Sequence, residues 1–170
     1  MPNNILIVGP AKIGKTTLIK RLLKDLIPLV VRGFYKEPII ESDIIKGYSI
    51  ITLDLKWQIL AHVDIEGPDR IENIGVNIDG FEQLVLPQLS LFAGTELFII
   101  DEIGKMECLS KKFCQQVQLI FDSKIPSIAT GTPGETPYLD ELSNRNDVSI
   151  IKINNKNRNR LWKDILLQLG

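Results

Sequence analysis

Residues 9–17 read GPAKIGKTT and directly follow the apolar stretch NILIV at residues 4–8. The spacing, a glycine, four residues and then Gly-Lys-Thr, matches the pattern of a phosphate-binding loop. Glycines let the backbone bend closely around a phosphate with its N–H groups pointing inward, and the helix that follows contributes the positive end of its dipole. We therefore predict that every residue of this stretch binds nucleotide: Gly9, Pro10, Ala11, Lys12, Ile13, Gly14, Lys15, Thr16 and Thr17.

Two side chains of this loop are expected to act on the phosphates directly. Lys15 should reach the outer phosphates, which makes it a candidate catalytic residue. The hydroxyl of Thr16 should ligate Mg²⁺, the cofactor that such loops use with nucleoside triphosphates.

The chain as a whole alternates short runs rich in Ile, Val and Leu with longer segments of helical period. This pattern is typical of a parallel sheet flanked by helices, and it predicts an α/β fold. Strands are predicted at residues 4–8, 29–35, 96–100, 126–130 and 148–153, and helices at residues 15–26, 81–91, 110–121 and 158–169. Pro87 is expected to break the second helix, and Ser110 is expected to cap the third.

One part of the chain departs from this alternation. Residues 48–53 and 57–63 flank the short segment 54–56, which predicts a hairpin. Hairpin strands are antiparallel, so we expect an antiparallel extension of the parallel core. Residues 40–46 are expected to form an exposed loop, and residues 64–75 a polar loop.

Composition restricts the class of protein. The 170 residues have the length of one domain, so we expect residues 1–170 to form a single unit. The 20 basic and 21 acidic residues form no long run of one sign, which argues against a nucleic-acid or membrane partner. No stretch approaches the roughly 18 apolar residues of a membrane span, and the start MPNNILIVGP has no export signal. We expect a cytoplasmic monomer.

The two cysteines, Cys108 and Cys114, lie six residues apart in a segment of helical period. This spacing fits neither a CxxC redox pair nor a zinc site, so both are interpreted as helix packing residues.

A second candidate for the site is the pair of carboxylates in FIIDEIG, residues 98–104. Asp101 follows a buried strand, where the carboxyl edge of a parallel sheet faces the ligand, so it is predicted to hold Mg²⁺. Glu102 follows it and is the candidate catalytic residue that activates water. Thr130 ends another strand at the same edge, where it is a candidate sensor of a phosphate or of the water.

Other polar residues are weaker candidates. Asn157 and Arg158 begin the last predicted helix, in a turn where a nucleotide base can be contacted, although Asn at a helix start is more often a cap. His62 lies in the apolar run ILAHV and is interpreted as an edge-strand residue rather than a base. The candidates for an arginine that stabilises the transition state are Arg32, Arg70, Arg145 and Arg158. Each of them is individually more typical of a surface residue.

With these residues in view, the chain resembles the small THEP-type nucleoside-triphosphatases, the family that includes the cancer-related nucleoside-triphosphatase. The resemblance runs nearly end to end, and DEIGKMECLSKKF at residues 101–113 is its most specific part. It is carried by GPAKIGKTT, GFYKE, ILAHVDIEGP, VNIDGFEQLVLPQL, FIIDEIGKMECLSKKF, IPSIAT and NRNRLWKDI.

The resemblance implies a single P-loop domain with a RecA-like central sheet in a three-layer fold. It also implies Mg²⁺-dependent hydrolysis of several nucleoside triphosphates, such as ATP and GTP, to the diphosphate and phosphate. This chain departs from the family in two places. Ala11 and Lys12 stand where the family often has Pro and Gly, and a left-handed backbone at Lys12 would cost about 1 kcal/mol. Lys36, Ile40 and Ile45 stand where the family usually has a Thr and two arginines.

Two alternative functions use the same loop. A nucleotide or small-molecule kinase would pass the phosphoryl group to a hydroxyl held by the hairpin, although no arginine-rich lid segment is evident. A GTP switch is suggested by the DxxG pattern of residues 101–104. Residues 155–158 read NKNR and lack the Asp of the guanine-reading NKxD, so the switch ranks below the kinase.

Overall fold

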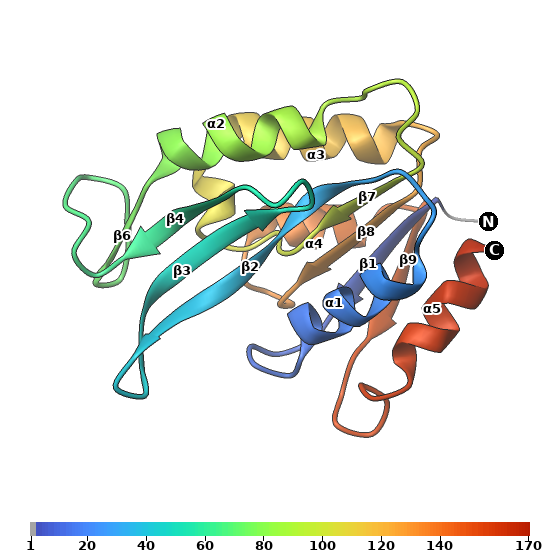
Figure 1. Cartoon of the computed structure of the whole chain (residues 1–170), viewed down its shortest axis with the longest axis horizontal. Helices are drawn as coiled ribbons and strands as arrows, with labels where there is room; N and C mark the ends of the chain where they lie inside the picture. The colour runs from blue at the N-terminus through green and yellow to red at the C-terminus, as the bar shows by residue number, and fades with distance from the viewer. Residues whose placement is uncertain (1–2) are drawn as a thin grey trace.

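A computed structural model describes residues 3–170, which form one nine-stranded sheet with helices on both faces (Figure 1). The elements are β1 (Asn4–Val8), α1 (Lys15–Asp25), β2 (Val31–Glu41), β3 (Ile44–Thr52), β4 (Trp57–His62), β5 (Arg70–Ile71), β6 (Ile74–Val76), α2 (Ile78–Leu89), β7 (Leu97–Ile100), the 3₁₀ turn η1 (Glu107–Leu109), α3 (Lys111–Asp122), β8 (Ser127–Gly131), α4 (Pro137–Ser143), β9 (Val148–Lys152) and α5 (Leu161–Leu169).

The strands lie in the order β5-β6-β4-β3-β2-β7-β8-β1-β9. Strands β2, β7, β8, β1 and β9 are parallel, and β3, β4, β6 and β5 continue the sheet with antiparallel pairs. The predicted parallel core with an antiparallel extension is therefore confirmed. Because β1, β7 and β8 are neighbours, their carboxyl ends meet at one edge of the sheet, where α/β proteins bind their ligands.

Two apolar cores separate the layers. Helices α1 and α5 pack on one face of the sheet around residues such as Leu22 and Ile165. Helices α2, α3 and α4 pack on the other face. There Phe34, Phe81 and Phe113 meet edge to face, with ring centroids 5.2 to 6.0 Å apart. Such pairs add about 0.5–1.5 kcal/mol each beyond the burial of their surface.

The expected loop at residues 40–46 is wrong. Strand β2 reaches Glu41, β3 begins at Ile44, and only Ser42 and Asp43 turn the chain. Both turn residues have positive φ, 48° and 63°, which suits the right-handed twist of a two-residue hairpin. Ser-Asp lacks the Asn-Gly or Asp-Gly pair that is typical of such turns, so a two-residue hairpin is not indicated at this position. The two strands form a long arm that projects from the sheet (Figure 1).

Pro87 does not break α2, which runs without interruption to Leu89. It lies in the last turn, where it removes one helical hydrogen bond but only Gln88 and Leu89 follow it. The helix also begins before the predicted start, at Ile78, because the Asn77 side chain accepts a hydrogen bond from the N–H of Gly80.

Three other expectations need correction. The polar loop at residues 64–75 contains the short strands β5 and β6, and α4 was not predicted. Helix α5 begins at Leu161 rather than at 158. Cys108 and Cys114 are free thiols packed against the core, but they lie in η1 and α3 rather than in one helix, since Ser110 caps α3 between them.

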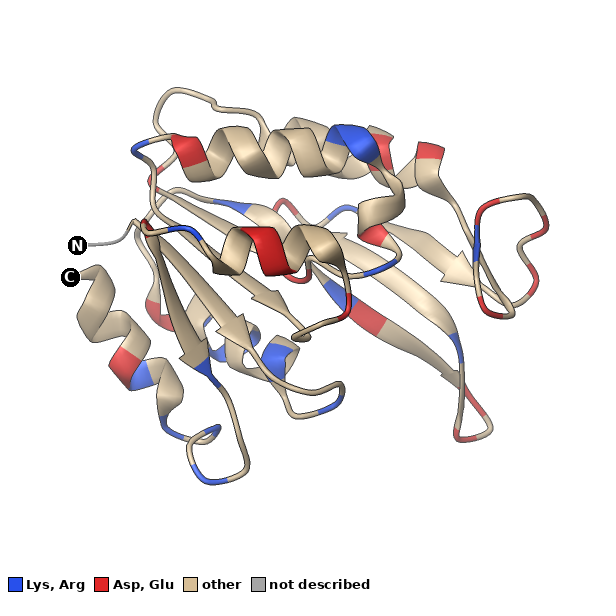
Figure 2. Ribbon diagram, turned by 180° about the vertical axis from the view of Figure 1, so that it is seen from behind, with Lys and Arg blue, Asp and Glu red and all other residues tan. Residues whose placement is uncertain are grey.

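Charges of both signs are spread over the helices, strands and loops, with acidic residues more frequent in the loop before β6 and basic residues more frequent between β9 and α5 (Figure 2). None of the helices within residues 3–170 has the length and apolar character needed to cross a bilayer.

Gly33 provides a test of the contact between β2 and β7. It has φ +131°, and a Cβ there would lie 1.8 Å from the carbonyl oxygen of Ile99. We expect Gly33→Ala to lower the free energy of unfolding by about 3 kcal/mol, because two backbones must separate. Gly67→Ala is the control, since φ is +140° but no atom lies within 4 Å of an added Cβ. Urea denaturation of both variants measures the difference, and equal losses would contradict the steric explanation.

Candidate functional site

The loop between β1 and α1 has the backbone that phosphate binding requires. Gly14 precedes the first helical residue, Lys15, and has φ +112°, a conformation that strains any residue with a Cβ. Gly9 is needed for a different reason, because a Cβ there would lie 2.6 Å from Cγ2 of Ile153. Lys12 has φ +63°, so the left-handed backbone considered for this position is present. The first N–H groups of α1 thus point to the carboxyl edge of the sheet, where an anion is favoured.

Lys15 is buried at this edge. Its ammonium donates to the carbonyl oxygens of Gly9 and Pro10 at 2.8 and 3.0 Å, and to the hydroxyl of Thr132 at 3.3 Å. Burial lowers the pKa of Lys15, and the carboxylates of Glu102 and Asp101 oppose this shift. A desolvated ammonium with only neutral partners in direct contact is well suited to bind phosphate.

Asp101 joins three elements. Its carboxylate, 1% exposed, accepts hydrogen bonds from Thr16 at 2.6 Å and from Thr130 at 2.5 Å. Burial raises the pKa of Asp101, and these two hydroxyls oppose the rise. An adjacent carboxylate and hydroxyl are the oxygen donors that Mg²⁺ uses in proteins, so the residues fit this ion. Within residues 3–170 no three His, Cys, Asp or Glu residues gather to hold a metal. An ion here would therefore complete its shell with water or with oxygens of a bound ligand.

Glu102 belongs to a cluster of charged side chains that also contains Lys36 and Glu107. The ammonium of Lys36 lies 2.8 Å from Oε1 of Glu102 and 2.8 Å from Oε1 of Glu107. Burial raises the pKa of Glu107 to about 7, although Lys36 opposes the rise. Burial alone would lower the pKa of Lys36, but the Glu107 and Glu102 carboxylates raise it above its ordinary value. Lys36 therefore carries its charge throughout the neutral range.

A pocket of about 460 Å³ joins these groups. The phosphate-binding loop forms one wall through Ala11, Lys12, Gly14, Lys15, Thr16 and Thr17. Lys36, Glu102 and Lys105 lie farther along, with Thr132 and Glu135 from the segment after β8. The far wall comes from the antiparallel extension and is mainly apolar: Pro38, Ile45, Tyr48, Ile71 and Ile74. The pocket is thus longer than a site for phosphates alone.

Seven predicted site residues do not line this pocket: Gly9, Pro10, Ile13, Asp101, Thr130, Asn157 and Arg158. Thr130 is fully buried and its hydroxyl is bonded to Asp101, whereas Thr132 reaches the pocket wall. The side chain of Asn157 is engaged with the backbone of its own turn, at Asn154 and Lys152. Arg158 donates to the carbonyl oxygen of Ile13 at 3.4 Å, behind the phosphate-binding loop.

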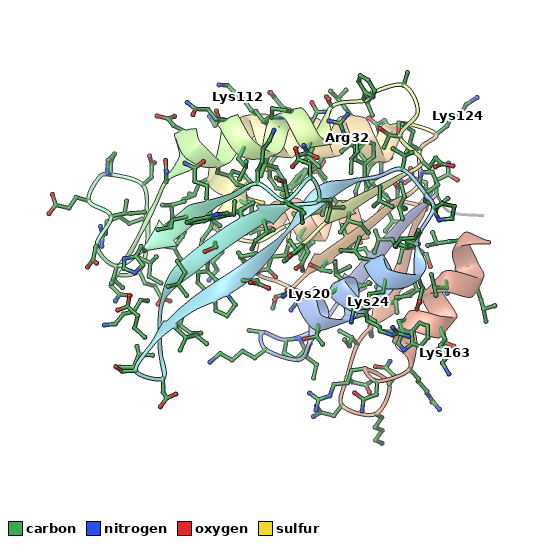
Figure 3. All side chains as sticks on the ribbon, in the orientation of Figure 1. Lys20, Lys24, Arg32, Lys112, Lys124 and Lys163 are labelled. Atoms are coloured by element: carbon green, nitrogen blue, oxygen red, sulfur yellow. The ribbon has the colours of Figure 1, made fainter. Side chains whose placement is uncertain are left out.

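The other arginine candidates lie away from the pocket as well. Arg32 donates to the carbonyl oxygen of Pro87 in α2, on the face of the sheet opposite α1 (Figure 3). Arg70 bonds carbonyl oxygens of its own loop. Arg145 is paired with Asp122 and Asp147. His62 lies at the end of β4 beside Asp64 and Glu41.

Sequence reasoning missed Lys36 and Glu107 as members of the site. In the sequence, Lys36 stands out only as a departure from the family, and Glu107 belongs to no motif of its own. Alternation along β2 offered a signal, because Phe34 and Lys36 share a face and Phe34 is in the core. A lysine placed inward by strand alternation requires a buried acidic partner, and the acids of residues 101–107 were the available ones.

Comparison with known proteins agrees with this geometry. A family model described as NTPase matches residues 4–166. The nucleoside-triphosphatase THEP1 of Thermotoga maritima is 44% identical over 163 residues, which cover 95% of this chain and 92% of that protein. The cancer-related nucleoside-triphosphatase of Homo sapiens is 34% identical over 185 residues, covering 98% and 96%. The chain belongs to this nucleoside-triphosphatase family.

Solved structures of the nucleoside-triphosphatase family share the fold. The crystal structure of THEP1 from Aquifex aeolicus superimposes with a TM-score of 0.90 at 31% identity, covering 98% of this chain and 99% of that chain. The solution structure of the human cancer-related nucleoside triphosphatase gives a TM-score of 0.82, also at 31% identity, covering 98% and 97%. The resemblance inferred from the motifs and the predicted three-layer P-loop fold are both confirmed.

Lys12 gives a test of strain in the phosphate-binding loop. We expect Lys12→Gly to raise the free energy of unfolding by about 0.5–1 kcal/mol, because relief of the left-handed strain exceeds the entropy cost of glycine. Lys12→Ala is the matched control, since it removes the side chain but keeps the strain. Chemical denaturation of the three proteins gives the comparison. Equal stability of the Gly and Ala variants would show that φ +63° costs nothing here.

Proposed function

We propose that this protein hydrolyses several nucleoside 5'-triphosphates, ATP and GTP among them, to the diphosphate and phosphate, and that it requires Mg²⁺. Its membership of a family whose curated relatives are named nucleoside-triphosphatases supports hydrolysis. The observation that carries the proposal is the approach of Thr16 to Asp101, 2.6 Å, beside a pocket shared by Lys15 and Glu102. A metal-binding pair, a phosphate-binding cation and a base are the parts that phosphoryl transfer requires.

The phosphate-binding loop supplies the binding energy. Amide groups around Gly14 donate to phosphate oxygens, and Lys15 exchanges its carbonyl partners for the outer phosphates. This exchange is favourable because it replaces neutral acceptors of a buried ammonium by charged ones. Thr17 lines the same wall and is available to the part of the phosphate chain nearer the nucleoside.

Thr16 and Asp101 are the residues that would hold Mg²⁺. The ion, when bound, neutralises charge on the phosphate oxygens. Thr130 acts on the pocket indirectly, since its hydroxyl holds the other oxygen of Asp101.

Glu102 receives the proton of the attacking water. The water oxygen forms a bond to the terminal phosphorus, the bond from that phosphorus to the bridging oxygen breaks, and the nucleoside diphosphate leaves with the electron pair. Lys15 balances the charge that gathers on the transferring group. General base catalysis of this kind contributes about 10²–10⁴-fold to the rate.

Phosphate release from ATP, GTP, CTP and UTP tests the proposal. We expect turnover in the wild type that is lost on chelation of Mg²⁺, and a kcat lower by about 100-fold or more in Glu102→Gln with little change in KM. Lys15→Ala should lose both affinity and turnover. Matched controls are Lys24→Ala, an exposed lysine of the same helix (Figure 3), and Glu141→Gln, an exposed glutamate of α4. A wild type without turnover, or full turnover in Glu102→Gln, would refute the mechanism.

A second candidate function is the transfer of the phosphoryl group to a hydroxyl compound. The pocket favours it in one respect, because its far wall of Pro38, Ile45, Tyr48, Ile71 and Ile74 offers more room than water needs. Phosphate release in the absence of any acceptor separates the two functions. Rapid release from the protein and nucleotide alone supports hydrolysis, whereas release that is negligible until a hydroxyl compound is added supports transfer.

A further inference from the structure

We infer that Lys36 is a positioning residue for catalysis: its ammonium, anchored on the buried carboxylate of Glu107, holds Glu102 in the orientation that activates water. The inference rests on the proposed function of Glu102, and it adds two residues that neither the motifs nor the comparisons assign. Each step depends on contacts among strand β2, the segment after β7 and the turn η1.

The first step is the shared ammonium. Lys36 contacts Oε1 of Glu102 and Oε1 of Glu107 at the same distance, 2.8 Å, and its side chain is only 11% exposed. A carboxylate held through one oxygen keeps the other oxygen available. Among residues 3–170, the Lys36 contact to Oε1 is the one ion pair recorded for Glu102, so Oε2 remains available to accept a proton.

The second step is the anchor. Glu107 is fully buried, and within the described chain its Oε2 has no hydrogen-bond partner. Lys36 is the cation that neutralises it. A buried carboxylate without its counter-charge costs several kcal/mol, so Glu107 keeps the ammonium from leaving for solvent. Gly104 permits this arrangement, because a Cβ there would lie 2.8 Å from Oε2 of Glu107 and 3.1 Å from Oε1 of Glu102.

The third step is the position of the cluster in the pocket. Lys36 and Glu102 line the same pocket as Lys15 and Thr16, whereas the lining contains no arginine. Lys36 also contributes to lowering the pKa of Lys15, so its charge acts across the site. The aromatic ring of Tyr48, with its centroid 5.1 Å from the ammonium, packs on the remaining side. The ammonium is thus confined on several sides.

Confinement matters because a base acts only within a narrow geometry. A displacement of about 1 Å can reduce a rate by about 10²-fold even when the substrate still binds. Glu102 follows a strand end and is partly exposed, so its carboxylate would otherwise sample several rotamers. The ion pair with Lys36 selects among them. Loss of Lys36 should therefore reduce kcat and leave KM nearly unchanged.

The experiment separates this role from structural support. Lys36→Met keeps most of the length of the side chain but removes the cation that faces Glu107. At a pH above 7, where Glu107 is ionised in the wild type, we therefore expect a lower melting temperature and a kcat for ATP reduced by about 100-fold. The double variant combines Lys36→Met with Glu107→Gln, so neither of these two positions carries a charge. We expect the melting temperature to recover and the kcat to stay low. Lys36→Arg keeps the charge and should restore part of the kcat.

Lys20→Met is the matched control, because Lys20 pairs with Glu37 of the same strand but is exposed on α1 (Figure 3). Its kcat should equal that of the wild type. Recovery of both kcat and melting temperature in the double variant would overturn the inference and leave Lys36 a structural residue. A raised KM with unchanged kcat in Lys36→Met would also overturn it, since Lys36 would then serve substrate binding.

Crystal structures of the wild type and the double variant provide a readout that does not depend on turnover. We expect the Glu102 carboxylate to move when Lys36 is lost, and an unmoved carboxylate would overturn the inference. A wild type that releases no phosphate refutes the proposed function, and the two structures still decide whether Lys36 positions Glu102. The two failures are thus distinguishable.

Discussion

The buried carboxylate of Asp101 is the constraint on which the site depends. Its two oxygens accept hydrogen bonds from Thr16 and Thr130, so one side chain after β7 connects the start of α1 with β8. A carboxylate with 1% exposure is stable only when such donors compensate its lost hydration. The same two bonds fix the first turn of α1 relative to the sheet edge. The Asp101 carboxylate therefore sets both the geometry of the loop and the position of the metal-binding oxygens. The two hydroxyls offset the cost of burying this carboxylate.

The antiparallel extension gives the pocket its second half. Strands β2 and β3 form a long arm, and the apolar residues Ile45 and Tyr48 face the phosphate-binding loop across the pocket. A parallel sheet alone would leave that side of the edge open to solvent. Exclusion of water strengthens every charge interaction inside the pocket, including those of Lys15 and Glu102. The extension thus affects the chemistry although it holds neither the phosphate-binding loop nor the metal-binding pair.

The sequence allowed the parallel core to be predicted because its signals are local: apolar runs mark strands, and GPAKIGKTT marks the turn into α1. The meeting of Thr16 and Asp101 followed from the rule that parallel strands share a carboxyl edge. The hairpin turn at Ser42 and Asp43 was missed because Ser and Asp favour turns in general, whereas the pair typical of a two-residue hairpin, Asn-Gly or Asp-Gly, is absent. Lys36 was missed for a different reason: its role depends on Glu107, which is distant in sequence and reaches it only through the fold.

The position of the cation in the arm bears on how the site works in this chain. The resemblance implies two arginines where Ile40 and Ile45 stand, and these isoleucines are paired across β2 and β3. Strand alternation places Lys36 on the same face of β2 as Ile40, but closer to the core. Ile40 is 58% exposed, so a cation there would be screened by salt, whereas the Lys36 side chain is 11% exposed and is screened far less. The cation of this arm, Lys36, therefore lies close to the core, where it pairs with the buried carboxylate of Glu107 and the partly exposed carboxylate of Glu102. A cation held in this way is less sensitive to salt than a cation at the solvated tip of the arm would be.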